Sequence, residues 1–317
     1  MADVIKCATR DAYGAALKQL GTRDDILVLD ADLAKATKTI TFKKEFPEKF
    51  IDCGIAEANM MGVAAGLATT GYTVFASSFA MFAAGRAFEQ VRNSIAYPNL
   101  NVKIGATHAG ISVGEDGASH QCCEDIALMR SIPNMVIINP ADDVEAIAAV
   151  HAAVDHEGPV YMRFGRLAVP RVNSEDYKFE LGKGVLLKDG KDVTIVATGL
   201  MVNEALVAAE TLATEGIDAR VINIHTIKPI DKDILVAAAK ETGAIVTAEE
   251  HSVIGGLGSA VSEALAEEYP VPVVKLGVND TFGKSGPALE LLKIFGLDAE
   301  NIVIKAKKAI ELKNKLA

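Results

Sequence analysis

The chain has 317 residues, 50% of them hydrophobic and 23% charged, and its formal net charge is −10. This length and composition favour about two well-packed domains over a disordered chain. The acidic balance, without a dense basic run, argues against a nucleic-acid surface, and the sequence has no run of about 18 uncharged apolar residues that would cross a membrane.

Short β-branched runs alternate with alanine-rich helical patterns in the first half of the chain. Strands are predicted at 25–30, 49–54, 72–77, 101–107, 134–139 and 159–164, and helices at 11–20, 57–69, 80–95, 122–131 and 142–155. Because these strands are apolar on both faces, they indicate a parallel sheet that helices cover on each side.

The pattern changes at residues 165–191, which contain prolines and charged residues and show no clear hydrophobic periodicity. This stretch is predicted to be a linker with a small hairpin. A second alternation follows, with strands at 192–198, 218–224, 244–250 and 271–277 and helices at 202–215, 231–241, 257–268 and after 287. We predict an α/β fold of two consecutive domains, residues 1–170 and 185–317, joined by a linker at 171–184. Each domain is expected to be a mainly parallel sheet flanked by helices.

The beginning of the sequence, MADVIKCATRDAYG, lacks the charged and then apolar pattern of a signal peptide. The four cysteines, Cys7, Cys53, Cys122 and Cys123, form no CxxC pair. We therefore expect a cytoplasmic protein with reduced thiols.

Ligands in open α/β sheets bind beyond the carboxyl ends of the strands. In this chain, the positions at or after predicted strand ends hold Asp30, Asp32, Glu57, residues 77–82, the loop from His108 to His120, and Arg163. These positions are the candidates for a functional site.

The most unusual of these segments is the loop HAGISVGEDGASHQ, residues 108–121. Its three glycines permit tight turns, and it holds two of the six histidines of the chain. Histidine and aspartate side chains donate, accept or transfer protons. One alternative is a solvated surface loop. Another is a metal site, but such a site would need a third firm ligand, and the spacing of His108, Asp116 and His120 matches no strong metal-binding pattern.

Glu57 opens a predicted helix in CGIAEANMMGVAAGLA, where its neighbours are almost all apolar. It is either an ordinary acid at a helix start, favoured by the helix dipole, or a carboxyl group whose burial suits it to carrying a proton. Phe79 and Phe82 lie at a strand-to-helix junction. They are either core residues or a stacking surface for a planar ring.

Five stretches together resemble, in their order and spacing, the C-terminal half of a transketolase. They are CGIAEANM (53–60), FASSFAMFAAGRAFEQVR (75–92), HAGISVGEDGASHQ (108–121), GPVYMRFGR (158–166) and EEHSVIGGLGSA (249–260). The resemblance covers nearly the whole chain. It implies that the first domain binds the pyrimidine half of thiamine diphosphate and that the second is the transketolase C-terminal domain, whose purpose is less certain.

The resemblance also implies roles for individual residues at the cofactor. Glu57 matches the glutamate that hydrogen-bonds N1′ of the aminopyrimidine, which would let that ring deprotonate the thiazolium carbon. Phe79 and Phe82 match aromatic residues that pack against the pyrimidine. Asp32, in LDADLAKAT, matches an aspartate near the cofactor.

Other matches lie on the substrate side. His108 and His120 match histidines near the oxygens of the substrate, and Asp116 matches an aspartate that contacts a hydroxyl group. Arg163 and Arg10 match arginines that hold a sugar phosphate, for which a guanidinium group is well suited. Histidines and an aspartate around a polyol would bind hydroxyl groups and shuttle protons while a two-carbon ketol unit moves from a ketose phosphate to an aldose phosphate.

The chain departs from the family at two places. A serine that usually binds phosphate is replaced by Ala36, with Thr37 as the candidate substitute, so sulfonated or branched sugars stay open as substrates. The family's metal motif, GDG followed by a later asparagine, is also missing, because Glu115 interrupts the similar GEDG. We therefore expect Mg²⁺ and the diphosphate to be held by a separate N-terminal partner subunit, in an α2β2 assembly in which this chain alone is inactive.

Three alternatives have specific sequence arguments. The β subunit of a thiamine-dependent 2-oxo-acid dehydrogenase has the same two domains, but GEDGASHQ and the arginine of YMRFGR favour a transketolase. A deoxyxylulose-phosphate synthase is normally one longer chain. A non-catalytic partner protein would have no need of an intact Glu57 with Phe79, Phe82, His108 and His120.

Overall fold

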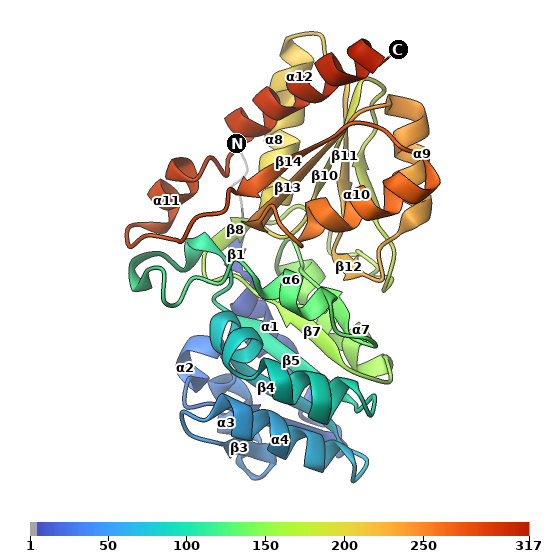
Figure 1. Ribbon diagram of the computed structural model, residues 1–317. Helices are drawn as coiled ribbons and strands as arrows, with labels where there is room; N and C mark the ends of the chain where they lie inside the picture. The colour runs from blue at the N-terminus through green and yellow to red at the C-terminus, as the bar shows by residue number, and fades with distance from the viewer. Residues whose placement is uncertain (1–4, 317) are drawn as a thin grey trace.

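A seven-stranded sheet forms the frame of the first domain, which lies in the lower half of Figure 1. Its strands are β2 (Ile26–Asp30), β3 (Phe50–Asp52), β4 (Thr73–Phe79), β5 (Val102–Thr107), β6 (Val136–Ile138), β7 (Val160–Arg163) and β12 (Thr226–Lys228). They are arranged in the order β12-β6-β7-β5-β4-β2-β3 and pair in parallel, except that β12 runs antiparallel to β6. The structure describes residues 5–316.

A five-stranded sheet forms the second domain. Its strands are β9 (Val185–Lys188), β10 (Val193–Ala197), β11 (Ala219–Asn223), β13 (Ile245–Ser252) and β14 (Val273–Val278), in the order β14-β13-β10-β11-β9. Only the edge strand β9 is antiparallel to its neighbour. The two sheets confirm the predicted fold class, because their central strands are buried on both faces as the apolar runs indicated.

Helices cover both faces of each sheet (Figure 1). In the first domain they are α1 (Thr9–Leu20), α2 (Ala34–Thr37), α3 (Ile40–Glu45), α4 (Glu57–Ala68), α5 (Phe88–Gln90), α6 (Asp125–Arg130) and α7 (Asp143–Asp155), with π-helical turns at Met81–Arg86 and Val91–Ala96 on either side of α5. In the second domain they are α8 (Met201–Thr214), α9 (Lys232–Thr242), α10 (Leu257–Glu268), α11 (Ala288–Ile294) and α12 (Ala299–Leu316).

The linker region corrects one expectation. It contains no hairpin of its own among the described residues, since β8 (Ala168–Pro170) pairs with β1 (Lys6–Ala8) near the other end of the first domain. The sequence also did not indicate that β12, which follows the second domain's β11, would leave that domain's sheet and join the edge of the first. Both pairings join segments far apart in the chain, which local periodicity cannot report.

The two domains share an apolar core. One continuous cluster of buried side chains runs from Met60 and Ile126 in the first domain to Ile245 and Leu257 in the second. The domains are therefore packed against each other as one body, and groups from the second domain can reach the site of the first.

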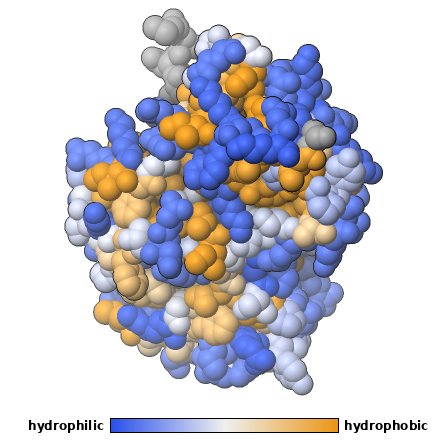
Figure 2. Space-filling model, turned by 45° about the horizontal axis from the view of Figure 1, so that its top comes forward, coloured by the Kyte–Doolittle hydropathy of each residue, from blue (hydrophilic) through white to orange (hydrophobic). Residues whose placement is uncertain are grey.

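On the surface, apolar side chains lie in separate patches between hydrophilic ones on the face seen in Figure 2. The most exposed large apolar side chains include Ile55, Tyr97, Phe282 and Leu289. Within residues 5–316, no helix combines the length and the apolar composition needed to cross a membrane.

Candidate active site

Glu57 is the first residue of α4, and its side chain is only 1% exposed. Its Oε2 accepts a hydrogen bond from Nη1 of Arg86 at 2.7 Å, and Ser78 Oγ lies 3.4 Å from Oε1. The helix begins at this point because the chain turns from β3 into an apolar run, and a first-turn acid favours the helix dipole. Of the two readings of Glu57, the structure supports the buried carboxyl group.

Arg86 is a residue that sequence reasoning missed. Its guanidinium lies over the ring of Phe82, 4.5 Å from the ring centroid, while pairing with Glu57. The Arg86 side chain is half exposed, so it can be displaced without breaking the core. The sequence could have indicated Arg86, because it follows Phe82 by four residues, about one helical turn, and so lies on the same side of the segment as that candidate ring.

Four rings, those of Phe79, Phe82, His108 and His120, form an aromatic wall that Arg86 links to the carboxyl group of Glu57. Phe79 stacks on His108 with ring centroids 3.8 Å apart, and Phe79 and Phe82 lie nearly parallel at 6.0 Å. His120 meets Phe82 edge-on at 5.3 Å. Because the rings come from the ends of β4 and β5 and from the loop after β5, the structure brings together the residues that the sequence placed beyond neighbouring strands.

His108 is held as a neutral imidazole. Burial first, and then the charges of Arg10 and Arg166, lower its pKa to about 3. Arg10 Nη1 lies 2.9 Å from Nε2, which must accept, so Nδ1 carries the proton and donates to Thr107 Oγ1 at 3.0 Å. Both ring nitrogens therefore have partners, and His108 is suited to orienting neighbours rather than to releasing a proton at neutral pH.

The rim of this site carries charged groups of both signs. Arg166 donates through Nη1 to the carbonyl oxygen of Val113 at 2.5 Å, and the same nitrogen lies 3.5 Å from Glu115 and 3.8 Å from Asp116. The Arg166 and Asp116 side chains are about 40% exposed, at 37% and 43%. Both side chains are therefore accessible to a polar ligand.

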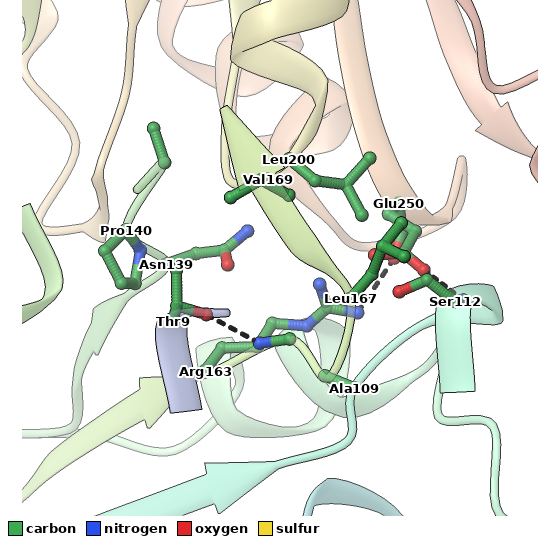
Figure 3. A pocket seen from close by; sticks show the side chains of 12 residues that line it. Thr9, Ala109, Ser112, Asn139, Pro140, Arg163, Leu167, Val169, Leu200 and Glu250 are labelled. Carbon is green, nitrogen blue, oxygen red and sulfur yellow. Dashed lines mark hydrogen bonds between the residues drawn. The ribbon is translucent and has the colours of Figure 1, made fainter. Parts of the chain in front are cut away.

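Arg163 ends β7, as the sequence predicted, but its side chain is buried. It is 3% exposed, its Nε donates to Asp125 at 2.9 Å, and its Nη2 donates to the backbone oxygen of Glu250 at 2.8 Å (Figure 3). These contacts hold it between the domains and argue against the expected contact with a sugar phosphate. Arg166, three residues later, follows the end of β7 and stands at the rim instead. The sequence could have indicated this difference, because Arg163 belongs to a buried strand, whereas Arg166 lies in the more accessible loop that follows it.

Thr37 also has a different environment from the one expected. Its side chain is buried, and its hydroxyl donates to Asp30 Oδ2 at 2.7 Å, as Thr39 does at 2.9 Å. Its hydroxyl faces the interior, so the structure argues against Thr37 as a phosphate ligand. Burial raises the pKa of Asp30 to about 6, against the lowering effect of these hydrogen bonds. Asp32 is exposed two residues beyond β2, with a left-handed φ of 62°.

The arrangement can bind a planar heterocycle and a polar chain at the same time. A buried carboxylate and aromatic rings suit the heterocycle, while two arginines, a histidine and a carboxylate suit hydroxyl groups and an anionic end. Within the described part of the chain, no three His, Cys, Asp or Glu side chains are arranged to hold a metal ion.

Comparison with known proteins gives two domain matches. Residues 5–171 match the transketolase pyrimidine-binding domain, and residues 182–302 match the transketolase C-terminal domain. A putative transketolase C-terminal section of Methanocaldococcus jannaschii is 53% identical, with 95% of each chain covered. A 6-deoxy-6-sulfo-D-fructose transketolase subunit of Clostridium sp. is 47% identical, with 96% of this chain and 95% of that protein covered.

A solved structure described as a split gene transketolase, inactive beta4 tetramer, is 60% identical. It superimposes with a TM-score of 0.91 and covers 96% of this chain and 99% of its own. The similarity thus extends over whole chains that are themselves parts of divided transketolases.

Proposed function

Because the chain belongs to the transketolase family, as the pyrimidine-binding and C-terminal domains of a split enzyme, we propose that it is the C-terminal subunit of a two-subunit transketolase. The complex would transfer a two-carbon ketol unit from a ketose phosphate to an aldose phosphate. It would do so through thiamine diphosphate, which the matched pyrimidine-binding domain implies.

The observation that carries this proposal is the placement of Glu57 beside the aromatic wall. A 1% exposed carboxyl group, paired with the arginine that lies over the Phe82 ring, fits a protonated heterocyclic nitrogen and the faces of its ring. Thiamine diphosphate, when bound, supplies the electron sink that cleavage of a bond beside a carbonyl group requires. Glu57 would hold the proton at ring atom N1′, and Arg86 would give up its contact with Glu57 as the ring enters.

The remaining residues would serve the sugar. His108, neutral and fixed by Arg10, would orient a substrate oxygen, and the more exposed His120 would exchange protons with it. Asp116 would accept a hydrogen bond from a hydroxyl group. Arg10 and Arg166 would hold the anionic end of the sugar, in place of Arg163. Asp32 would lie at the cofactor side, beyond β2.

The proposed partner supplies what the sequence lacks. The chain contains no GDG segment, so the diphosphate and Mg²⁺ would be held by an N-terminal subunit, with an active site between the two chains in an α2β2 assembly. The likeness to a transketolase C-terminal section supports this arrangement.

Reconstitution tests the proposal. The purified chain, its N-terminal partner and an equimolar mixture would each be assayed for ketol transfer from xylulose 5-phosphate to ribose 5-phosphate, with thiamine diphosphate and Mg²⁺. We expect turnover only in the mixture. Substantial turnover by this chain alone would refute the division of the active site.

An unusual sugar is the second candidate substrate. The 47% identical Clostridium protein is described as acting on 6-deoxy-6-sulfo-D-fructose, and a guanidinium group binds a sulfonate as well as a phosphate. Replacing xylulose 5-phosphate with this sulfonated ketose as the donor separates the two candidates, because the true donor will have the higher kcat/KM.

A further inference from the structure

A buried carboxyl group of the second domain contacts the active-site loop, here residues 108–121. Glu250, on β13, accepts a hydrogen bond at Oε1 from the backbone N–H of Ser112 at 2.5 Å (Figure 3). Glu250 is 4% exposed, and Gly110 lies so close that a Cβ there would overlap its carboxyl group. The part of the loop from Gly110 to Ser112 is thus packed tightly against Glu250.

Arg163 explains why Glu250 is fixed in place. Its Nη2 donates both to the backbone oxygen of Glu250 at 2.8 Å and to that of Cys122 at 3.3 Å, while Asp125 holds its Nε. The end of β13 and the residue that directly follows the loop are therefore bonded to one guanidinium group. This gives the buried arginine a positioning role.

A second contact holds the far side of the loop. Nε2 of Gln121 donates to the carbonyl oxygen of Lys284 at 2.9 Å and to that of Ile111 within the loop at 3.1 Å. Gly117 packs against Ser285, whose hydroxyl would collide with a Cβ at that position. The segment before α11 therefore supports the stretch between Asp116 and His120.

The loop needs such support because its backbone is unusual. His108 has a φ of 56°, and Gly110, Gly114 and Gly117 have φ values of 80°, 84° and 75°. A non-glycine residue in this region is disfavoured and persists only where its surroundings hold it. The conformation that presents His108 and His120 is thus maintained by contacts outside the loop.

We propose that the C-terminal domain positions the active-site loop, and that Glu250 is the positioning residue through its hydrogen bond to Ser112. The catalytic meaning of this role rests on the proposed transketolase function. Glu250 acts through the loop and does not touch the substrate, so its loss is expected to affect sugar binding and turnover without changing the affinity for the cofactor.

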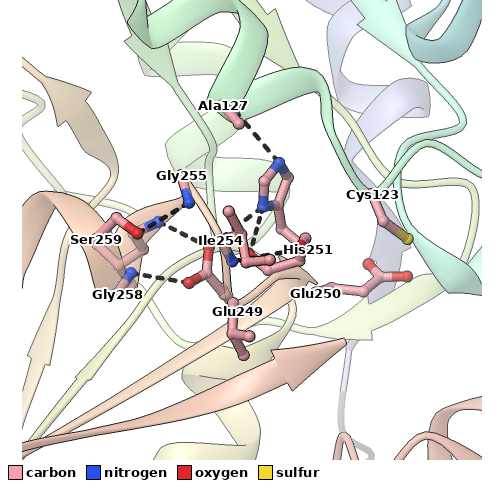
Figure 4. Close-up of polar contacts among 12 residues, drawn as sticks. Cys123, Ala127, Glu249, Glu250, His251, Ile254, Gly255, Gly258 and Ser259 are labelled. Carbon is pink, nitrogen blue, oxygen red and sulfur yellow. Dashed lines mark hydrogen bonds and ion pairs between the residues drawn. The ribbon is translucent and has the colours of Figure 1, made fainter. Parts of the chain in front are cut away.

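Glu249 offers a matched control. It is equally buried and adjacent on β13, but it points to the opposite face, where it accepts from the N–H groups of Leu257 and Gly258 at the start of α10 (Figure 4). Glu249→Ala should therefore lower thermal stability and leave the loop unaffected. Glu250→Ala leaves the Ser112 N–H without its partner, and we expect the sugar KM of the reconstituted complex to rise about tenfold. Glu250→Gln keeps an acceptor oxygen and should restore most of the loss.

A glycine pair separates the contact from backbone strain. Gly110 and Gly216 have φ values of 80° and 79°, so alanine is strained to a similar degree at both. Only Gly110→Ala would push against Glu250, because a Cβ at Gly216 meets nothing within 4 Å. We expect a raised sugar KM for Gly110→Ala and an unchanged one for Gly216→Ala.

Hydrogen exchange of the isolated chain gives a readout that does not depend on activity. Amides of the active-site loop should exchange about tenfold faster in Glu250→Ala than in the wild type, and at the wild-type rate in Glu249→Ala. Equal loop exchange in all three would overturn the proposal, as would faster exchange in Glu250→Ala with unaltered sugar kinetics. A wild-type complex with no transfer activity would instead count against the proposed function, and the exchange rates would still decide whether Glu250 holds the loop.

Discussion

Replacing Glu57 with glutamine should separate stability from activity. The carboxyl group is buried, but its one ionic partner, Arg86, is half exposed and will be hydrated when the pair is broken. Such a pair contributes less than about 1 kcal/mol to folding, and glutamine has nearly the same shape. The free energy of unfolding should therefore change by less than about 1 kcal/mol.

The effect on ketol transfer should be far larger. Glutamine at position 57 cannot take and return the proton that Glu57 would share with N1′, and loss of such a positioned acid costs about 10²- to 10⁴-fold in rate. The measurements are chemical unfolding of the isolated chain and initial transfer rates of the reconstituted complex at saturating thiamine diphosphate. Near-normal turnover in Glu57→Gln would refute the assignment of Glu57.

Glu145→Gln is the matched control for this experiment. Glu145 is fully buried in α7 and accepts hydrogen bonds from Tyr177 and Asn223 at Oε1 and from the N–H of Ala141 at Oε2. Glutamine cannot accept at both positions, so we expect a loss of about 1–3 kcal/mol in unfolding free energy and unchanged turnover. This profile is the reverse of the one expected for Glu57→Gln.

Three further outcomes are expected. Arg166→Gln should raise the KM for a sugar phosphate by about 10-fold or more with little change in stability. Arg163→Gln, which leaves the buried Asp125 without its ionic partner, should cost about 3–5 kcal/mol of stability and raise the sugar KM no more than Glu250→Ala does. A larger rise in KM for Arg163→Gln than for Glu250→Ala, with little loss of stability, would restore Arg163 as the phosphate ligand. Thr37→Val should destabilise the chain by about 1–3 kcal/mol, because Asp30 loses a hydrogen bond, and should leave the sugar KM unchanged; a raised KM would return Thr37 to the substrate. Burial raises the pKa of Glu145 to about 7, so its protonation stabilises the fold fully below its ordinary value of 4.5, and this contribution is lost as pH rises through 7. Unfolding free energies of wild type and Glu145→Gln should therefore differ more at pH 5 than at pH 8, by roughly 3 kcal/mol at most, and a difference independent of pH would contradict the raised pKa.

Local pattern was sufficient for much of the fold and for part of the site. The apolar runs and alanine-rich periods place the central strands of both sheets and most helices within a few residues of their observed ends. The rule that ligands bind beyond strand ends then selects Glu57, Phe79, Phe82, His108 and His120. The structure brings the four rings together and joins Glu57 to them through Arg86. Neighbours within about ten residues determine these features, so a single sequence reports them.

The sequence by itself thus determined the order of most elements and several of the side chains at the site, because periodicity and strand ends are local properties. Only the tertiary structure decided that Arg163 points into the core while Arg166 stands at the rim, and that Arg86 covers Glu57. It also decided that Glu250 reaches Ser112 across 138 positions of sequence. These outcomes depend on which surfaces pack together. The contacts that stabilise this packing join residues far apart in the chain, so a pattern read from neighbouring residues does not reveal them.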